Sequence, residues 1–149
     1  MVVIEPHPDN LTVLRENLSQ ISNVVILEGA LGGTAEEAIS LRDRGSEVGY
    51  TIYREPADNP KAETIHDVRV FRLSDLTDEN ERIGLLKLDI EGAEIGLLEN
   101  DLDSLQSIDV VFAELHERIA PGTFTKFFEF SRGRILLKDK YEKYLSIKR

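Results

Sequence analysis

The segment Leu85–Glu94 (LLKLDIEGAE) constrains the fold more than any other part of this 149-residue chain. Its apolar run ends at Asp89, and two further acids, Glu91 and Glu94, follow around the small pair Gly92-Ala93. An apolar run that stops at an acid is typical of a buried parallel strand, and open α/β sheets bind ligands at the carboxyl ends of such strands. The segment therefore predicts a strand that delivers carboxylates to a ligand-binding edge, followed at once by a helix.

Apolar runs and helical spacing alternate along the rest of the chain. Helical spacing covers residues 9–21, 91–99 and 122–130, and strand-like runs cover 2–4, 24–27, 66–73, 83–88, 108–113, 134–137 and 144–147. This alternation predicts an α/β fold with a largely parallel sheet. Residues 34–64 fit either antiparallel strands at 38–41 and 49–53 or a short helix at 35–42. We predict a single domain over residues 1–149 with a β-rich insertion at 34–76.

Composition excludes several classes of protein. The chain has no cysteine, so disulfides, thiolate catalysis and cysteine metal sites are excluded, and three histidines leave little room for an all-histidine zinc site. The formal net charge of −10 argues against nucleic-acid binding. No apolar run approaches the ~20 residues that span a bilayer, and we find no signal peptide, so we expect a cytoplasmic protein.

The charge is uneven. Residues 132–149 hold seven Lys/Arg and two Asp/Glu, which is +5 locally and leaves −15 for residues 1–131. A basic segment of this kind fits contact with phosphates, with an acidic partner or with the acidic remainder of the chain. The simpler interpretation is a solvated terminal strand in which lysines guard an exposed edge.

Several short runs follow one another in an order that resembles a known family. They are Ile4-Glu5-Pro6-His7-Pro8, Gly29-Ala30-Leu31-Gly32, Leu73-Ser74-Asp75-Leu76, Lys87-Leu88-Asp89-Ile90-Glu91-Gly92-Ala93-Glu94 and Glu114-Leu115-His116. Together they resemble the FkbM family of S-adenosylmethionine-dependent methyltransferases over about the whole chain. The Lys-x-Asp-Ile-Glu-Gly-Ala-Glu run is specific, and the Glu-Pro-x-Pro element is moderately so. The resemblance implies a Rossmann-like class I methyltransferase fold with helices on both faces of the sheet.

The chain departs from the family pattern at its beginning. Family members carry, before the Glu-Pro element, a first strand and a glycine-rich loop that cradles the methionine part of the cofactor. Here the family's second strand begins at Val2, and no Gly-x-Gly turn follows a strand and opens a helix. We therefore expect an N-terminally truncated fold with half of the cofactor site removed. Its exposed sheet edge would allow contact with another chain as an oligomer.

Four residues are candidates for binding the cofactor: Glu5, Ala30 and Leu31 through the resemblance, and Asp89 through its place at the carboxyl end of a strand. Glu5 would bind the ribose, because a carboxylate at this place in a βαβ unit commonly accepts hydrogen bonds from the two hydroxyls. Ala30 and Leu31 would lie against the adenine, and Asp89 would contact the cofactor amino group or orient an acceptor hydroxyl. The simpler interpretations are an acid near a helix start for Glu5 and ordinary turn packing for Ala30 and Leu31.

Glu91 and Glu94 are candidate substrate-binding residues. Both fall in the first turn of the helix predicted after Asp89. Acids at that place also stabilise the helix dipole without taking part in any chemistry. A further interpretation of Glu94 is a structural ion pair with Lys87 or with an arginine.

Glu114 and His116 follow another predicted strand, two residues apart and on the same side of it. A histidine with an ordinary pKa near ~6.5 can take a proton from a hydroxyl, and an adjacent carboxylate can hold its tautomer. His116 is therefore our first candidate for a catalytic base, Asp89 the second, and Glu114 the supporting carboxylate. The alternative for Glu114 and His116 is a hydrogen-bonded surface pair. His7 and His66 are expected to be structural or exposed.

Three functional hypotheses follow from these residues. The first is transfer of a methyl group from S-adenosylmethionine to a hydroxyl on a small molecule or sugar. The second is an inactive or truncated methyltransferase-like fragment that acts as a partner-binding subunit. The third is a metal-assisted hydrolase that would use Asp89, Glu91, Glu114 and His116 to bind Mg²⁺ or Mn²⁺; we assign no metal ligands on this basis.

Overall fold

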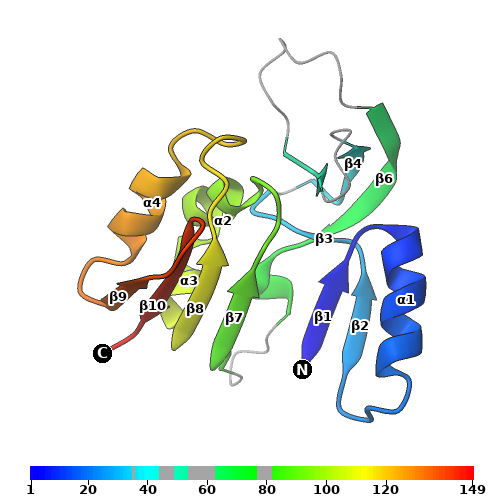
Figure 1. The fold of residues 1–149 in the computed structure, drawn as a ribbon, viewed down its shortest axis with the longest axis horizontal. Coiled ribbons are helices and arrows are strands. Elements are labelled where there is room, and N and C mark those ends of the chain that lie inside the picture. Colours follow the sequence, from blue (N-terminus) through cyan, green and yellow to red (C-terminus); the bar gives the residue numbers. More distant parts are fainter. Residues whose placement is uncertain (35, 44–48, 54–62, 77–81) are drawn as a thin grey trace.

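The computed structural model describes residues 1–34, 36–43, 49–53, 63–76 and 82–149. This part of the chain forms ten strands, four α-helices and one 3-10 helix, and the strands are arranged in three sheets (Figure 1). None of the described helices has the length and apolar character needed to cross a bilayer. The α/β class predicted from the sequence is confirmed.

The N-terminal unit is a parallel strand pair joined by a helix. Strand β1 (Val2–Glu5) pairs with β2 (Val25–Glu28), so that Glu5 and Glu28 lie opposite one another at the carboxyl ends. Helix α1 (Pro8–Leu18) connects the two strands, with proline at its start, where a missing N–H costs nothing, and Asp9 complementing the helix dipole. This arrangement places Glu5 directly before the start of α1.

The C-terminal sheet has the strand order β7-β8-β10-β9. Strands β7 (Leu85–Leu88) and β8 (Val110–Glu114) are parallel, and helices α2 (Glu94–Asn100) and α3 (Leu102–Ser107) connect them. Helix α4 (Thr123–Phe130) leads to the antiparallel pair β9 (Ile135–Lys138) and β10 (Lys143–Ile147). The main hydrophobic core lies here; among its fully buried members are Leu97, Leu105, Ile108, Val111 and Phe127.

The third sheet, of order β3-β6-β4-β5, comes mainly from the segment predicted as an insertion. Strand β3 (Ala30–Leu31) is parallel to β6 (Glu63–Phe71), whereas β4 (Ala38–Asp43) is antiparallel to both β6 and β5 (Tyr50–Thr51). The short 3-10 helix η1 (Leu73–Asp75) follows β6. The prediction of strands at 38–41 and 49–53 is confirmed by β4 and β5, although β4 runs on to residue 43 and β5 covers only residues 50–51. The alternative of a helix at 35–42 is wrong for residues 36–42; residue 35 lies outside the described part.

The prediction of a largely parallel sheet is wrong for the described strands. The pairs β1–β2, β3–β6 and β7–β8 are parallel, but β4–β5, β4–β6, β8–β10 and β9–β10 are antiparallel. The reason lies in the connections, because a parallel pair needs a long crossover, whereas the few residues between β9 and β10 allow only a hairpin. In Figure 1, β1 and β7 lie next to one another with their carboxyl ends at the same edge.

Candidate functional site

A cavity of about 440 Å³ lies at the carboxyl ends of β1, β7 and β8. This volume falls within the range of small-molecule sites. Its walls differ in character. The strand ends and the residues that follow them contribute four carboxylates, those of Glu5, Asp89, Glu91 and Glu114. The third sheet and the residue after β5 contribute apolar and aromatic side chains, those of Ala30, Leu31, Leu41, Tyr50 and Ile52. The cavity therefore offers one acidic and one apolar wall to a bound molecule.

The predicted cofactor-binding residues meet at this cavity. Glu5 is fixed at the start of α1, because its Oε1 accepts hydrogen bonds from the backbone N–H of His7 at 2.8 Å and from Asn10 Nδ2 at 3.3 Å. Ala30 and Leu31 are buried in β3 and also line the cavity. Asp89 lines the same cavity, so the structure brings together all four residues for which the sequence predicted contact with a cofactor.

A tight turn between β7 and α2, which we call the β7–α2 turn (residues 89–93), carries the next two acids. Asp89 follows β7 directly, and its Oδ2 lies 3.1 Å from Lys87 Nζ. Glu91 and Gly92 both adopt positive φ, +50° and +96°, and a Cβ on Gly92 would lie 2.6 Å from Ile119 Cγ2. The sequence predicted a helix from residue 91, but this left-handed turn delays α2 until Glu94 and directs Glu91 into the cavity.

Glu94 and His116 form a buried pair that the sequence did not predict. Glu94 is fully buried and does not line the cavity, so it has no access to a bound substrate in this arrangement. Its Oε1 accepts hydrogen bonds from the backbone N–H of Ile90 at 3.2 Å and from His116 Nδ1 at 2.8 Å. The opposite ring nitrogen of His116, Nε2, lies 3.4 Å from Glu91 Oε1. Glu94 therefore connects the β7–α2 turn to the segment that follows β8.

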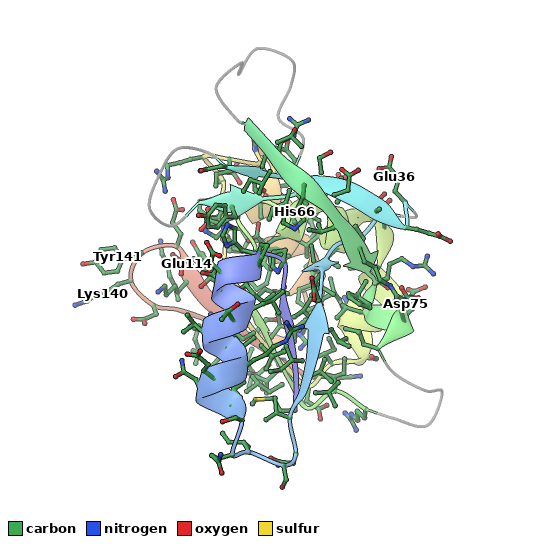
Figure 2. The ribbon with its side chains drawn as sticks, turned by 90° about the vertical axis from the view of Figure 1, so that its right-hand side faces the viewer. Glu36, His66, Asp75, Glu114, Lys140 and Tyr141 are labelled. Carbon is green, nitrogen blue, oxygen red and sulfur yellow. The ribbon has the colours of Figure 1, made fainter. Side chains whose placement is uncertain are left out.

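Glu114 does not hold the tautomer of His116. Its Oε2 lies 3.1 Å from Lys143 Nζ, on the neighbouring strand β10. Glu114 lines the cavity, whereas Lys140 and Tyr141 point away from the molecule (Figure 2). The carboxylates that contact His116 are instead Glu94 and Glu91.

The two carboxylates change the acidity of His116. Burial alone would lower the pKa of this imidazole, but the contacts with Glu91 and Glu94 and their negative charges outweigh burial and raise the pKa from 6.5 to about 10. His116 is therefore an imidazolium at neutral pH. In that state it has no lone pair with which to accept a proton from a substrate hydroxyl.

Asp89, Glu91 and His116 each offer one ligand atom, and these atoms lie within 4.8 Å of one another. A divalent cation could be held by such a set. Each group already has a partner, however, because Asp89 forms an ion pair with Lys87 and Glu91 contacts Nε2 of His116. A metal would have to displace an ammonium group and a proton, so we assign none to this cluster.

The apolar wall contains two contacts that the sequence gave no signal for. Tyr50 stacks on the buried ring of His7, with centroids 4.0 Å apart and an angle of 22° between the planes. Thr51 Oγ1 donates a hydrogen bond of 2.5 Å to the backbone carbonyl of Glu91. These contacts hold β5 over the cavity. His66 lies on β6 and is not part of the cavity wall (Figure 2).

Comparison with known proteins adds one finding. Residues 1–140 match the family model described as the methyltransferase FkbM domain. The match covers all of the residues that line the cavity. Neither a curated protein nor a solved structure gives a match.

Proposed function

Because the chain belongs to the FkbM methyltransferase family, we propose that it transfers a methyl group from S-adenosylmethionine to a hydroxyl oxygen of a small molecule or sugar. The observation that carries this proposal is the cavity at the ends of β1, β7 and β8, which carboxylates from the strand ends and apolar side chains from the third sheet line together. Ligands of open α/β sheets bind at this edge.

The residues around the cavity fit the chemical groups of S-adenosylmethionine. A carboxylate accepts hydrogen bonds only, so Glu5 suits the two adjacent ribose hydroxyls. Ala30 and Leu31 give the adenine an apolar surface. Asp89, Glu91 and Glu114 offer carboxylate oxygens in the cavity wall to a ligand that carries a sulfonium and an ammonium group.

When bound, S-adenosylmethionine supplies a methyl group that is already activated by its sulfonium sulfur. The chain's own residues then have to orient an acceptor hydroxyl and take its proton. Asp89 suits this role because it lines the cavity and its side chain is accessible. His116, the first candidate from the sequence, keeps its own proton at neutral pH. We therefore propose Asp89 as the base, with Glu91 and Glu114 beside it.

Titration calorimetry tests this function. S-adenosylmethionine is titrated into the unmodified chain, into Glu5→Gln and into Glu28→Gln, a matched control at the end of β2. Glu28 lies opposite Glu5 but outside the cavity wall, where it pairs with Arg15 at 3.1 Å. Loss of a charged hydrogen-bond acceptor should weaken binding about 10- to 100-fold in Glu5→Gln and leave Glu28→Gln unchanged.

Two results would contradict the proposal. The first is a folded chain that gives no heat with S-adenosylmethionine. The second is equal affinity in the unmodified chain and in Glu5→Gln. The first result would favour the alternative of a partner-binding subunit without methyl transfer, and the second would show that Glu5 does not hold the ribose.

A further inference from the structure

Glu94 is an unexpected residue for the place that it occupies. Its side chain is fully buried beside the main core, and its Oε2 has no hydrogen-bond partner in the described part of the chain. A buried carboxylate with an unfilled oxygen is costly, and an apolar side chain of similar volume often serves stability equally well or better. The contact with His116 stabilises the folded chain once both residues are present, but an apolar pair in the same space often serves stability equally well, so stability does not by itself account for the choice of an acid here.

The contacts of Glu94 show what the acid does instead. Its Oε1 accepts one hydrogen bond from within the β7–α2 turn, from the N–H of Ile90, and one from beyond β8, from His116 Nδ1. The other ring nitrogen of His116, Nε2, contacts the carboxylate of Glu91. These contacts form a closed ring around the turn. Asp89 and Glu91, which flank Ile90, are the two residues of the turn whose carboxylates line the cavity.

The turn requires such support because its backbone is strained. Glu91 has a φ of +50°, in the left-handed region that residues with a Cβ adopt at a cost. Such conformations persist only where the surroundings fix them. Thr51 fixes the carbonyl of Glu91 from the side of β5, and Glu94 fixes the N–H of the preceding residue from the side of α2.

We propose that Glu94 is a positioning residue for the reaction. Acting through Ile90 and His116, it holds the β7–α2 turn in the conformation that presents Asp89 and Glu91 to the cofactor and the acceptor. This inference rests on the proposed function. It assigns Glu94 a role without contact to substrate, in place of the substrate-binding role that the sequence suggested.

A pair of variants separates positioning from simple packing. Glu94→Gln and Glu94→Leu both remove the charge and have similar volume, but only glutamine keeps an oxygen that can accept hydrogen bonds from Ile90 and His116. A third variant, His116→Asn, keeps a donor near the position of Nδ1 and loses the contact with Glu91. Thermal unfolding establishes that each variant is folded before it is compared further.

The readouts are the affinity for S-adenosylmethionine by calorimetry and the hydrogen exchange of the Ile90 amide by NMR. We expect Glu94→Gln to bind within about threefold of the unmodified chain, and Glu94→Leu to bind at least about tenfold more weakly. Exchange at Ile90 should remain slow in Glu94→Gln and become at least about tenfold faster in Glu94→Leu. His116→Asn should keep Ile90 protected while the resonances of Glu91 shift.

The inference is overturned if folded Glu94→Leu leaves Ile90 protected and the resonances of Asp89 and Glu91 unmoved. It is also overturned if the glutamine and leucine variants lose the same affinity, since the loss of charge that both share would then explain the effect without the hydrogen bonds to Ile90 and His116. If the unmodified chain does not bind S-adenosylmethionine, the proposed function fails. The exchange of Ile90 still reports on positioning in that case, so the two failures are distinguishable.

Discussion

Loss of His116 should reduce stability by an amount that depends on pH. The contacts with Glu91 and Glu94 raise the pKa of this buried ring from 6.5 to about 10 in the folded state. Below about pH 6.5 both folded and unfolded chains are protonated at this residue, so the stabilisation is fully present. Between about pH 6.5 and 10 only the folded chain keeps the proton, and stability falls by about 1.4 kcal/mol for each pH unit. The full contribution is on the order of 5 kcal/mol and is lost as the pH passes 10.

Urea unfolding of the unmodified chain and His116→Asn at about pH 6.5, 8 and 9.5 measures this effect. Taking the difference between the two chains cancels the groups that titrate equally in both. His66→Asn, on strand β6 outside the cavity wall, is the matched control. We expect the difference in free energy of unfolding to shrink steadily with pH for His116→Asn, and more steeply than the difference for His66→Asn. A difference for His116→Asn that is constant, or that grows as the pH rises, would refute the reasoning.

Two further predictions concern packing. Gly33→Ala should destabilise the chain by about 3 kcal/mol or more, because the new Cβ would lie 1.9 Å from the carbonyl oxygen of Gly96. Its control is Gly84→Ala, which places a Cβ in open space and should leave the melting temperature nearly unchanged. Arg134→Met should lower the free energy of unfolding by about 3 kcal/mol, because this buried guanidinium donates to three backbone carbonyls and a serine hydroxyl. The exposed Arg132→Met is its control, and equal denaturant midpoints for the two arginine variants would contradict the account.

Local sequence patterns predicted most elements but not how the strands pair. Apolar runs and helical spacing located β7, α1 and α4, because the residues that face the core recur at the period of each strand or helix. Helix α3 was missed because it is short and follows α2 without a break in pattern. The direction of pairing was misjudged because it depends on contacts between distant segments. The delayed start of α2 depends on the positive φ of Glu91. A glutamate in the sequence gives no indication of a positive φ, because residues with a Cβ rarely adopt one.

The acids of the cavity were predictable for a simple geometric reason. Glu5, Asp89 and Glu114 each end or follow a strand, and the carboxyl ends of parallel strands meet at one edge of a sheet. The partner of His116 was not predictable in this way. Spacing along the strand suggested Glu114, but Glu94, 22 residues away in the chain, reaches the ring through tertiary packing. Contacts of this kind leave no local pattern in the sequence.

NMR mapping of S-adenosylmethionine binding tests the central claim most directly, because it shows where on the chain the cofactor lies. We predict that the amide resonances of Glu5, Leu31 and Asp89 shift together in proportion to occupancy, and that Glu28 at the end of β2 does not respond. The account is contradicted if no resonance moves in the folded chain. It is equally contradicted if the shifts gather only at the separate groove between Gly33 and Glu99, on the other side of Ile52.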